Sequence, residues 1–124
     1  LPVHATAAGK SLLAWHATAE LRRLLPAQLP KLAARSITSL DDFLEELGKV
    51  REQGYSVAWA EMEDDLAAVG APVRNHTGLV VGALTIGAPI SRVPEDRLKL
   101  CSEAVLKAAN SLSEQLGYRS EFTA

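Results

Sequence analysis

The first quarter of the chain is expected to form two short helices. Thr6 offers a hydroxyl that can cap a helix over Ala7–Trp15, because it can accept a backbone N–H that the first turn leaves free. A second short helix fits Thr18–Leu25 and is closed by Pro26. Residues 26–38 contain two prolines and are expected to form a connection.

A third helix follows this connection and has a clear apolar face. Ser39 is its expected N-cap, with Asp42 three positions later as an imperfect capping box. Gly54 supplies the stop. The apolar face consists of Leu40, Phe43, Leu44 and Leu47.

After Gly54 the hydrophobic period changes from helical to alternating. Residues 55–61 place Tyr55, Val57 and Trp59 on one face of a strand and Ser56, Ala58 and Ala60 on the other. Residues 67–74 and 79–87 are apolar on both faces, and the turn formers of residues 75–78 separate them. This pattern predicts a hairpin of two buried strands.

A long helix is expected at the end of the chain. It begins after Pro94, covers Glu95–Leu116 and ends at Gly117. Its expected buried stripe is Leu98, Cys101, Val105, Ala108, Leu112 and Leu116. Helices followed by three strands and a further helix predict an α+β fold with an antiparallel sheet.

Composition and charge narrow the class of protein. The 124 residues suit one domain, and 48% hydrophobic with 23% charged residues is ordinary globular composition. A net charge of -2 without a basic block disfavours nucleic-acid binding by these residues. The longest apolar run, residues 79–90, is shorter than the ~20 residues that cross a bilayer.

Two features of the sequence bear on the compartment and on the completeness of the chain. Cys101 is the only cysteine, so an intrachain disulfide is impossible and we expect a cytoplasmic protein. The chain opens on Leu1 without a methionine, as expected for a fragment of a longer protein.

The run Gly9-Lys10-Ser11 matches the end of a phosphate-binding P-loop. The first glycine of that pattern would stand at His4, and Ala7-Ala8 favours helix over an open loop. We therefore expect a small-residue helix start that does not bind ATP, and we expect Lys10→Ala to leave the fold nearly unchanged. A small nucleotide-binding or enzymatic domain built around this run is the alternative.

Other candidate chemistry is sparse. His4, His16 and His76 lie in separate segments without metal-ligand spacing. The acidic residues Glu61, Glu63, Asp64 and Asp65 are expected to form a solvated loop, with cation binding as the weaker alternative. Neither a nucleophile with its base nor a pair of catalytic carboxylates is recognisable. We therefore predict no catalytic residue, metal or cofactor, and no enzyme.

Four stretches together resemble a known family: "LPVHATAAGKSLLA", "SITSLDDFLEELGKVREQGYSVAWAE", "AAVGAPVRNHTGLVVGALTIGAPISR" and "AANSLSEQLGY". In order and spacing they resemble the effector-binding half of the IclR (isocitrate lyase regulator) transcription factors. The most specific elements are H-A-T/S-x-x-G-K-x-L-L-A and G-x-V-V-x-A-L-x-I-x-x-P. In that family the Gly-Lys run begins a helix beside the effector pocket and does not bind nucleotide.

The resemblance implies a fold and an assembly. The fold would be a GAF-like antiparallel sheet flanked by helices, with the first strands of the family domain missing from this chain. Residues 1–124 would then be a partial effector-binding domain, with a winged helix-turn-helix upstream that alone contacts DNA. Such regulators form homodimers or homotetramers and bind small carboxylates or aromatic acids. A pure oligomerisation module with a collapsed pocket is a further alternative.

The resemblance also implies a set of effector-binding positions. They are Leu1, Ala7, Ala8, Gly9, Ala58, Leu66, Ala68, Thr85 and Gly87. The amides of residues 7–9 and the Thr85 hydroxyl would donate to an acidic group. Family members that hold small keto acids tend to have a polar residue at position 58, a cysteine at 68 and serines at 85 and 87. The smaller or more apolar residues of this chain suit an aromatic or larger effector.

Overall fold

The structure is a computed structural model that describes residues 2–119. Its elements are α1 (Ala7–Leu13), α2 (Thr18–Leu24), α3 (Leu40–Gln53), β1 (Ser56–Trp59), β2 (Leu66–Arg74), β3 (Val80–Pro89), a 3-10 turn (Ile90–Arg92) and α4 (Glu95–Gln115). The predicted α+β order is confirmed, and every predicted helix begins at the expected residue.

The predicted caps define the helix ends. The Thr6 hydroxyl accepts the Gly9 N–H at 3.0 Å, and the Ser39 hydroxyl accepts the Asp42 N–H at 3.1 Å. Gly54 ends α3 with φ of 85°, a left-handed conformation that costs glycine little. Local polar contacts therefore fix where α1 and α3 start and where α3 stops.

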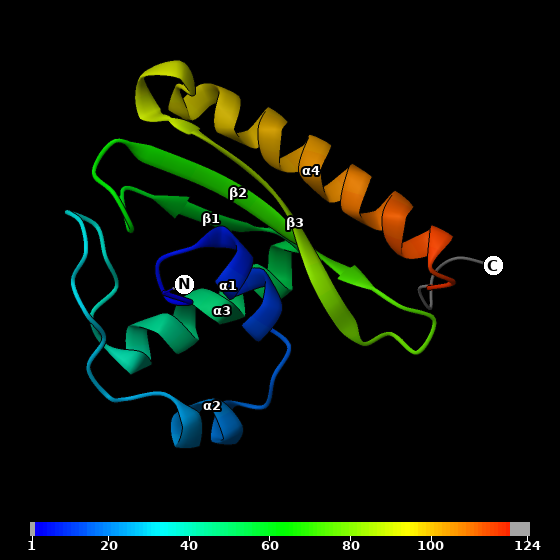
Figure 1. The fold of residues 1–124 in the computed structure, drawn as a ribbon, viewed down its shortest axis with the longest axis horizontal. Coiled ribbons are helices and arrows are strands. Elements are labelled where there is room, and N and C mark those ends of the chain that lie inside the picture. Colours follow the sequence, from blue (N-terminus) through cyan, green and yellow to red (C-terminus); the bar gives the residue numbers. More distant parts are fainter. Residues whose placement is uncertain (1, 120–124) are drawn as a thin grey trace.

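The sheet is a layer between two groups of helices (Figure 1). Its strands are antiparallel in the order β1-β2-β3. The helices α1, α2 and α3 lie on one side of the sheet, and α4 crosses the other side. Residues directly opposite one another share a face, so Ala58, Ala68 and Gly87 lie in one row on the α1 side.

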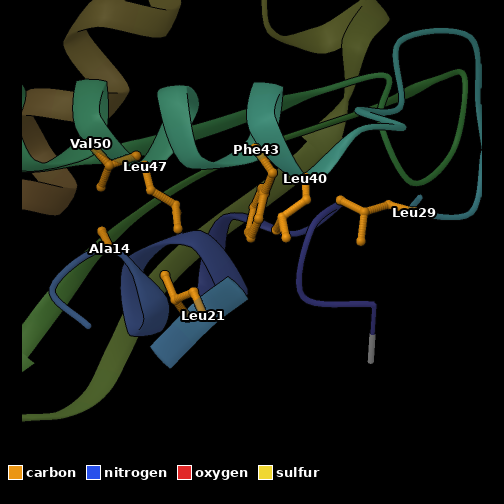
Figure 2. Packing of buried hydrophobic residues seen from close by; sticks show 7 residues of the cluster. All are labelled: Ala14, Leu21, Leu29, Leu40, Phe43, Leu47 and Val50. Atoms are coloured by element: carbon orange, nitrogen blue, oxygen red, sulfur yellow. The ribbon is translucent and has the colours of Figure 1, made fainter. Parts of the chain in front are cut away.

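A hydrophobic cluster fills the space among the first three helices (Figure 2). Leu40, Phe43, Leu47 and Val50 project from α3 towards α1 and α2, with the last three fully buried. Their partners are Ala14, Leu21 and Leu29. The apolar face predicted for α3 is thus its core face, except that Val50 extends it and Leu44 is only partly buried.

The prediction of two buried strands is correct for β2 and wrong for β3. In β2 the residues from Ala67 to Val73 are buried except Ala68. In β3, Val81 is 51% exposed and Ile86 is 49% exposed. The difference comes from the place of each strand in the sheet. β2 lies between two strands, whereas β3 is an edge strand with a neighbour on one side only, and an apolar sequence does not reveal which strands lie beside it.

The stripe predicted for α4 is also wrong in part. Val105 is buried, whereas Ala108, Leu112 and Leu116 are exposed. The buried face continues through Ser102, Ala109 and Ser113. Both serine hydroxyls donate to the carbonyl four residues earlier, at 2.9 and 2.8 Å, which satisfies them inside the core. The helix therefore turns small residues towards the sheet.

Candidate functional site

Small side chains on one face of the sheet let α1 approach closely. A Cβ on Gly70 would lie 3.0 Å from Thr85 Cγ2 and 3.2 Å from the Ala7 carbonyl oxygen. The Ser56 hydroxyl donates to that same carbonyl at 2.7 Å. The first turn of α1 is thereby held against β1 and β2, while the neighbouring small residues leave space beside it.

A cavity of about 190 Å³ occupies this space. It is lined by Ala5, Thr6, Ala7, Ala8, Ala58, Met62, Leu66, Ala68 and Thr85. The lining comes from the start of α1, from all three strands and from the loop between β1 and β2. Thr85 is exposed, so the cavity opens to solvent along β3.

The structure brings most of the predicted effector-binding residues together. Those that line the cavity are Ala7, Ala8, Ala58, Leu66, Ala68 and Thr85. Leu1 lies outside the described residues. Gly87 is opposite Ala68 in the sheet, but it is exposed and is not part of the cavity wall.

Gly9 has a packing role instead of the predicted donor role. Its amide donates to the Thr6 hydroxyl and is therefore not free for an acidic ligand. A Cβ at this position would lie 2.4 Å from the Val3 carbonyl oxygen, so only glycine fits. Of the three predicted backbone donors, the amides of Ala7 and Ala8 remain. These are the first two residues of a seven-residue helix.

Met62 is a lining residue that the sequence analysis missed, together with Ala5 and Thr6. It lies in the acidic segment 61–65, which was expected to be a solvated loop. The sequence did contain one indication of this role: Met62 is a large apolar residue within an otherwise acidic run.

Lys10 is completely buried and lies beside the cavity. Its ammonium donates to the Val57 carbonyl at 2.7 Å, to Glu61 Oε2 at 3.0 Å and to Glu46 Oε2 at 3.3 Å. An ammonium has three hydrogens, so these three acceptors saturate it. The expectation that Lys10→Ala leaves the fold nearly unchanged therefore does not agree with the structure.

Glu61 corrects the prediction of a solvated acidic loop. It is 7% exposed, whereas Glu63, Asp64 and Asp65 are exposed. Its Oε2 accepts the Trp59 N–H at 3.1 Å, and its Oε1 makes an ion contact with the Lys10 ammonium at 2.8 Å. Burial raises the pKa of Glu61, and the positive charge of Lys10 opposes that rise.

The Gly-Lys-Ser run is therefore a packing element and not a phosphate loop. Gly9 permits close contact with Val3, and Lys10 is saturated by protein acceptors. Ser11 is buried, with its hydroxyl 2.8 Å from that of Ser56. No strand precedes α1 in the described chain, whereas a P-loop follows one.

A second hollow lies at the far end of β2 and has a volume of about 340 Å³. Arg74 dominates it, with its guanidinium carbon 4.7 Å from the Trp15 ring centre and 5.9 Å from that of Tyr118. Arg74 also donates to the Gly78 carbonyl at 2.9 Å. These contacts tie the loop after α1 to the end of α4, which is a structural function.

Two kinds of site are absent from residues 2–119. No group of three or more histidine, cysteine, aspartate or glutamate side chains is placed to hold a metal ion. Among the helices of this range, none combines the length and the apolar character that a bilayer span requires.

Comparison with known proteins gives a consistent result. Residues 1–114 match the family model described as the bacterial transcriptional regulator IclR C-terminal domain. The HTH-type transcriptional regulator XynR of Escherichia coli (strain K12) is 39% identical over 119 residues, which are 95% of this chain and 47% of XynR. The chain spans about half the length of the curated relatives it matches.

Solved structures agree with the sequence comparison. The repressor BlcR of Agobacterium tumefaciens has a TM-score of 0.90 at 33% identity, covering 97% of this chain and 48% of BlcR. The inducer-binding domain of the PobR transcription factor from Acinetobacter, a double mutant in complex with 3-hydroxybenzoic acid, has a TM-score of 0.80 at 32% identity. That match covers 91% of this chain and 66% of the PobR domain.

Proposed function

The chain belongs to the IclR family of bacterial transcriptional regulators, as the C-terminal domain, and from this premise we propose that it senses a small-molecule effector. The matched relatives are named regulators and repressors, so the domain is not an enzyme. Effector binding in the cavity beside α1 would change DNA binding by a winged helix-turn-helix elsewhere in the same cytoplasmic protein.

One observation carries the proposal. Six of the nine residues that the family resemblance assigns to an effector pocket line a single cavity, and they come from α1, β1, β2 and β3. The volume of about 190 Å³ exceeds the ~150 Å³ of an engineered apolar cavity that holds benzene. This size supports ligand sensing over the alternative of an oligomerisation module with a collapsed pocket.

We propose that the effector is an aromatic or similarly apolar acid. The cavity lining includes Ala58, Met62, Leu66 and Ala68, whose apolar side chains suit a ring or a branched carbon skeleton. Among the lining residues only Thr6 and Thr85 have polar side chains. A small and strongly polar keto acid would therefore lose hydrogen bonds to water that the cavity does not replace.

The acidic group would lie beside the start of α1. There the first-turn amides of Ala7 and Ala8 have no acceptor within their own helix, and the Thr85 hydroxyl is exposed beside them. The Lys10 ammonium is not available, because its three hydrogens are used. A carboxylate at this end keeps contact with water, which avoids the cost of burying an unpaired charge.

The test is a thermal-unfolding titration with benzoate, 3-hydroxybenzoate and pyruvate, and with benzamide as the neutral counterpart of benzoate. We expect the aromatic acids to stabilise the protein more than pyruvate or benzamide. An acid at 100 times its dissociation constant should add about 2.7 kcal/mol to the free energy of unfolding. The absence of stabilisation by both aromatic acids would contradict the proposed effector class.

Variants locate the binding site. Ala8→Leu and Ala68→Phe should abolish the stabilisation by the acid while the fold stays intact, because both side chains occupy the cavity. Ala108→Leu is the matched control, since Ala108 is exposed on α4. Binding by Ala8→Leu and Ala68→Phe equal to that of the wild type would place the site elsewhere.

We also propose that the regulator assembles as a homodimer or homotetramer. The edge strand β3 exposes Val81 and Ile86, and an exposed apolar edge favours pairing with another chain. Light scattering after size-exclusion chromatography should give a mass of two or four chains. A monomer at micromolar concentration would contradict this part of the proposal.

A further inference from the structure

The three acceptors of Lys10 come from three different parts of the fold. Val57 belongs to β1, Glu46 to α3 and Glu61 to the loop that joins β1 to β2. Lys10 itself lies in α1, so a single buried ammonium connects four segments. Side-chain exposure of 0% for Lys10 and 9% for Glu61 shields the shortest ion contact from most of the solvent.

Two of these acceptors lie next in sequence to residues of the cavity wall. Val57 precedes Ala58, and Glu61 precedes Met62. On α1, Lys10 lies on the turn that follows Ala7 and Ala8. The ammonium therefore connects the walls of the cavity without lining it.

The loop that carries Met62 is held in an unfavourable backbone conformation. Ala60 has φ of 54°, in the left-handed region that a residue with a Cβ seldom adopts. Its N–H donates to the Leu66 carbonyl at 2.9 Å, and its carbonyl accepts the Arg35 N–H at 2.9 Å. Ser36 Oγ donates to the Glu61 carbonyl as well. Such a conformation persists only where the surroundings fix it.

We propose that Lys10 is a positioning residue for the cavity: by bridging α1, β1 and the loop at Glu61, it sets the distance between the Ala7–Ala8 wall and the Met62 wall. This inference rests on the proposed sensing function for its biological meaning. Lys10 acts through other residues and does not touch the effector. Glu46, with 29% side-chain exposure, is the member of the network that reaches solvent.

The chain offers a direct probe of this geometry, because Met62 is its only methionine. Protein labelled with ¹³C at the methionine methyl groups should give a signal for Met62, identified by its loss in Met62→Leu, which reports the cavity wall without any ligand. We expect Lys10→Leu to shift this signal by more than its own linewidth. We expect Glu61→Gln to shift it in the same direction, and the double variant to add no further shift, since both act on one contact.

Two controls separate positioning from a general loss of stability. Lys49→Leu replaces an exposed lysine of α3 and should leave the Met62 signal unchanged. Val50→Ala creates a cavity in the cluster of α1, α2 and α3, away from Met62, so it should lower the melting temperature but also leave the signal unchanged. A merely structural Lys10 would give the result of Val50→Ala.

The outcomes are decisive whether or not Lys10→Leu folds. If it does not fold, Glu61→Gln and Glu46→Gln replace it, and both should shift the Met62 signal, Glu61→Gln by more. A folded Lys10→Leu protein, or in its absence a folded Glu61→Gln protein, with the Met62 signal at its wild-type position would overturn the inference. The proposed effector class fails on a different measurement, the acid titration, so the two failures are distinguishable.

Discussion

Alternate residues of β2 face two differently packed environments. On the α4 side, Val69, Ala71 and Val73 pack against Val105 and Ala109, and the void between sheet and helix is about 20 Å³. On the α1 side, β2 carries Ala68 and Gly70, and the cavity beside this face is about 190 Å³. Both faces belong to the same three strands, so backbone geometry does not cause the difference.

The difference in packing between the two faces comes from the size and polarity of their side chains. The α4 face is closed by Val69, Val73 and Val105, while small residues of α4 let the helix pack closely against the sheet, as in an ordinary core. On the α1 side, Gly70 and Ser56 bring the helix close at one point, and a buried ion pair replaces apolar packing next to it. A face that combines close helix contact with small neighbours leaves room for a ligand.

The largest expected effect comes from breaking the ion pair on the α1 side. Lys10→Ala should lower the free energy of unfolding by about 3–5 kcal/mol, because Glu61 remains buried without its partner. Urea denaturation measures the change. Lys49→Ala, at an exposed lysine of α3, should change stability by less than about 0.5 kcal/mol.

A double-variant cycle sharpens this prediction. Lys10→Met combined with Glu61→Leu removes both charges and keeps apolar volume, so the pair of changes should cost far less than the sum of the single ones. If the losses of unfolding free energy were additive, the two side chains would act independently. That result would contradict the contact of 2.8 Å between them.

The next largest effect compares one substitution on the two faces of β2. Ala71→Leu should lower the free energy of unfolding by about 1–3 kcal/mol, because Ala71 is fully buried against α4 and has no room for three more carbons. Ala68→Leu should change it by less than about 1 kcal/mol, because the added carbons enter the cavity. Equal losses from the two variants would show that the α1 side is packed as tightly as the α4 side.

A smaller effect is expected at the open end of the cavity. Thr85→Val keeps the shape of the side chain and removes one hydroxyl, so stability without ligand should stay within about 0.5 kcal/mol. The affinity for an aromatic acid should fall by about 1 kcal/mol, the usual value of one hydrogen bond. Calorimetric titration measures the loss, and a complete loss of binding would assign Thr85 a larger role than proposed.

The smallest effect is the dependence of stability on the protonation of Glu61. Because burial raises the pKa of Glu61 in the folded state, the folded chain takes up its proton at a higher pH than the unfolded chain. The free energy of unfolding of the wild type should therefore rise, relative to Glu61→Gln, as the pH falls through the raised pKa. The gain should be complete below the ordinary carboxyl pKa. Lys10 and Glu46 are the charged groups that face Glu61, and parallel pH profiles of the two proteins would contradict this account.

Local sequence determined the elements of this protein and the residues at which its helices begin. Thr6, Ser39 and Gly54 act through contacts within a few residues, so their effects are visible in the chain itself. Alternation over residues 55–61 likewise marked β1. The family motifs added the positions of the cavity wall, which no local pattern contains.

Only the tertiary structure decided burial and the pairing of charges. Lys10 and Glu61 are 51 residues apart, and nothing near either one indicates that they meet in the interior. The exposure of β3 depends on which strand lies beside it. Ser113 is buried where its hydroxyl accepts the N–H of Arg74, which lies 39 residues earlier in the chain. Hydropathy describes what a side chain prefers, whereas burial follows from the neighbours that the fold supplies, and these neighbours are distant in sequence.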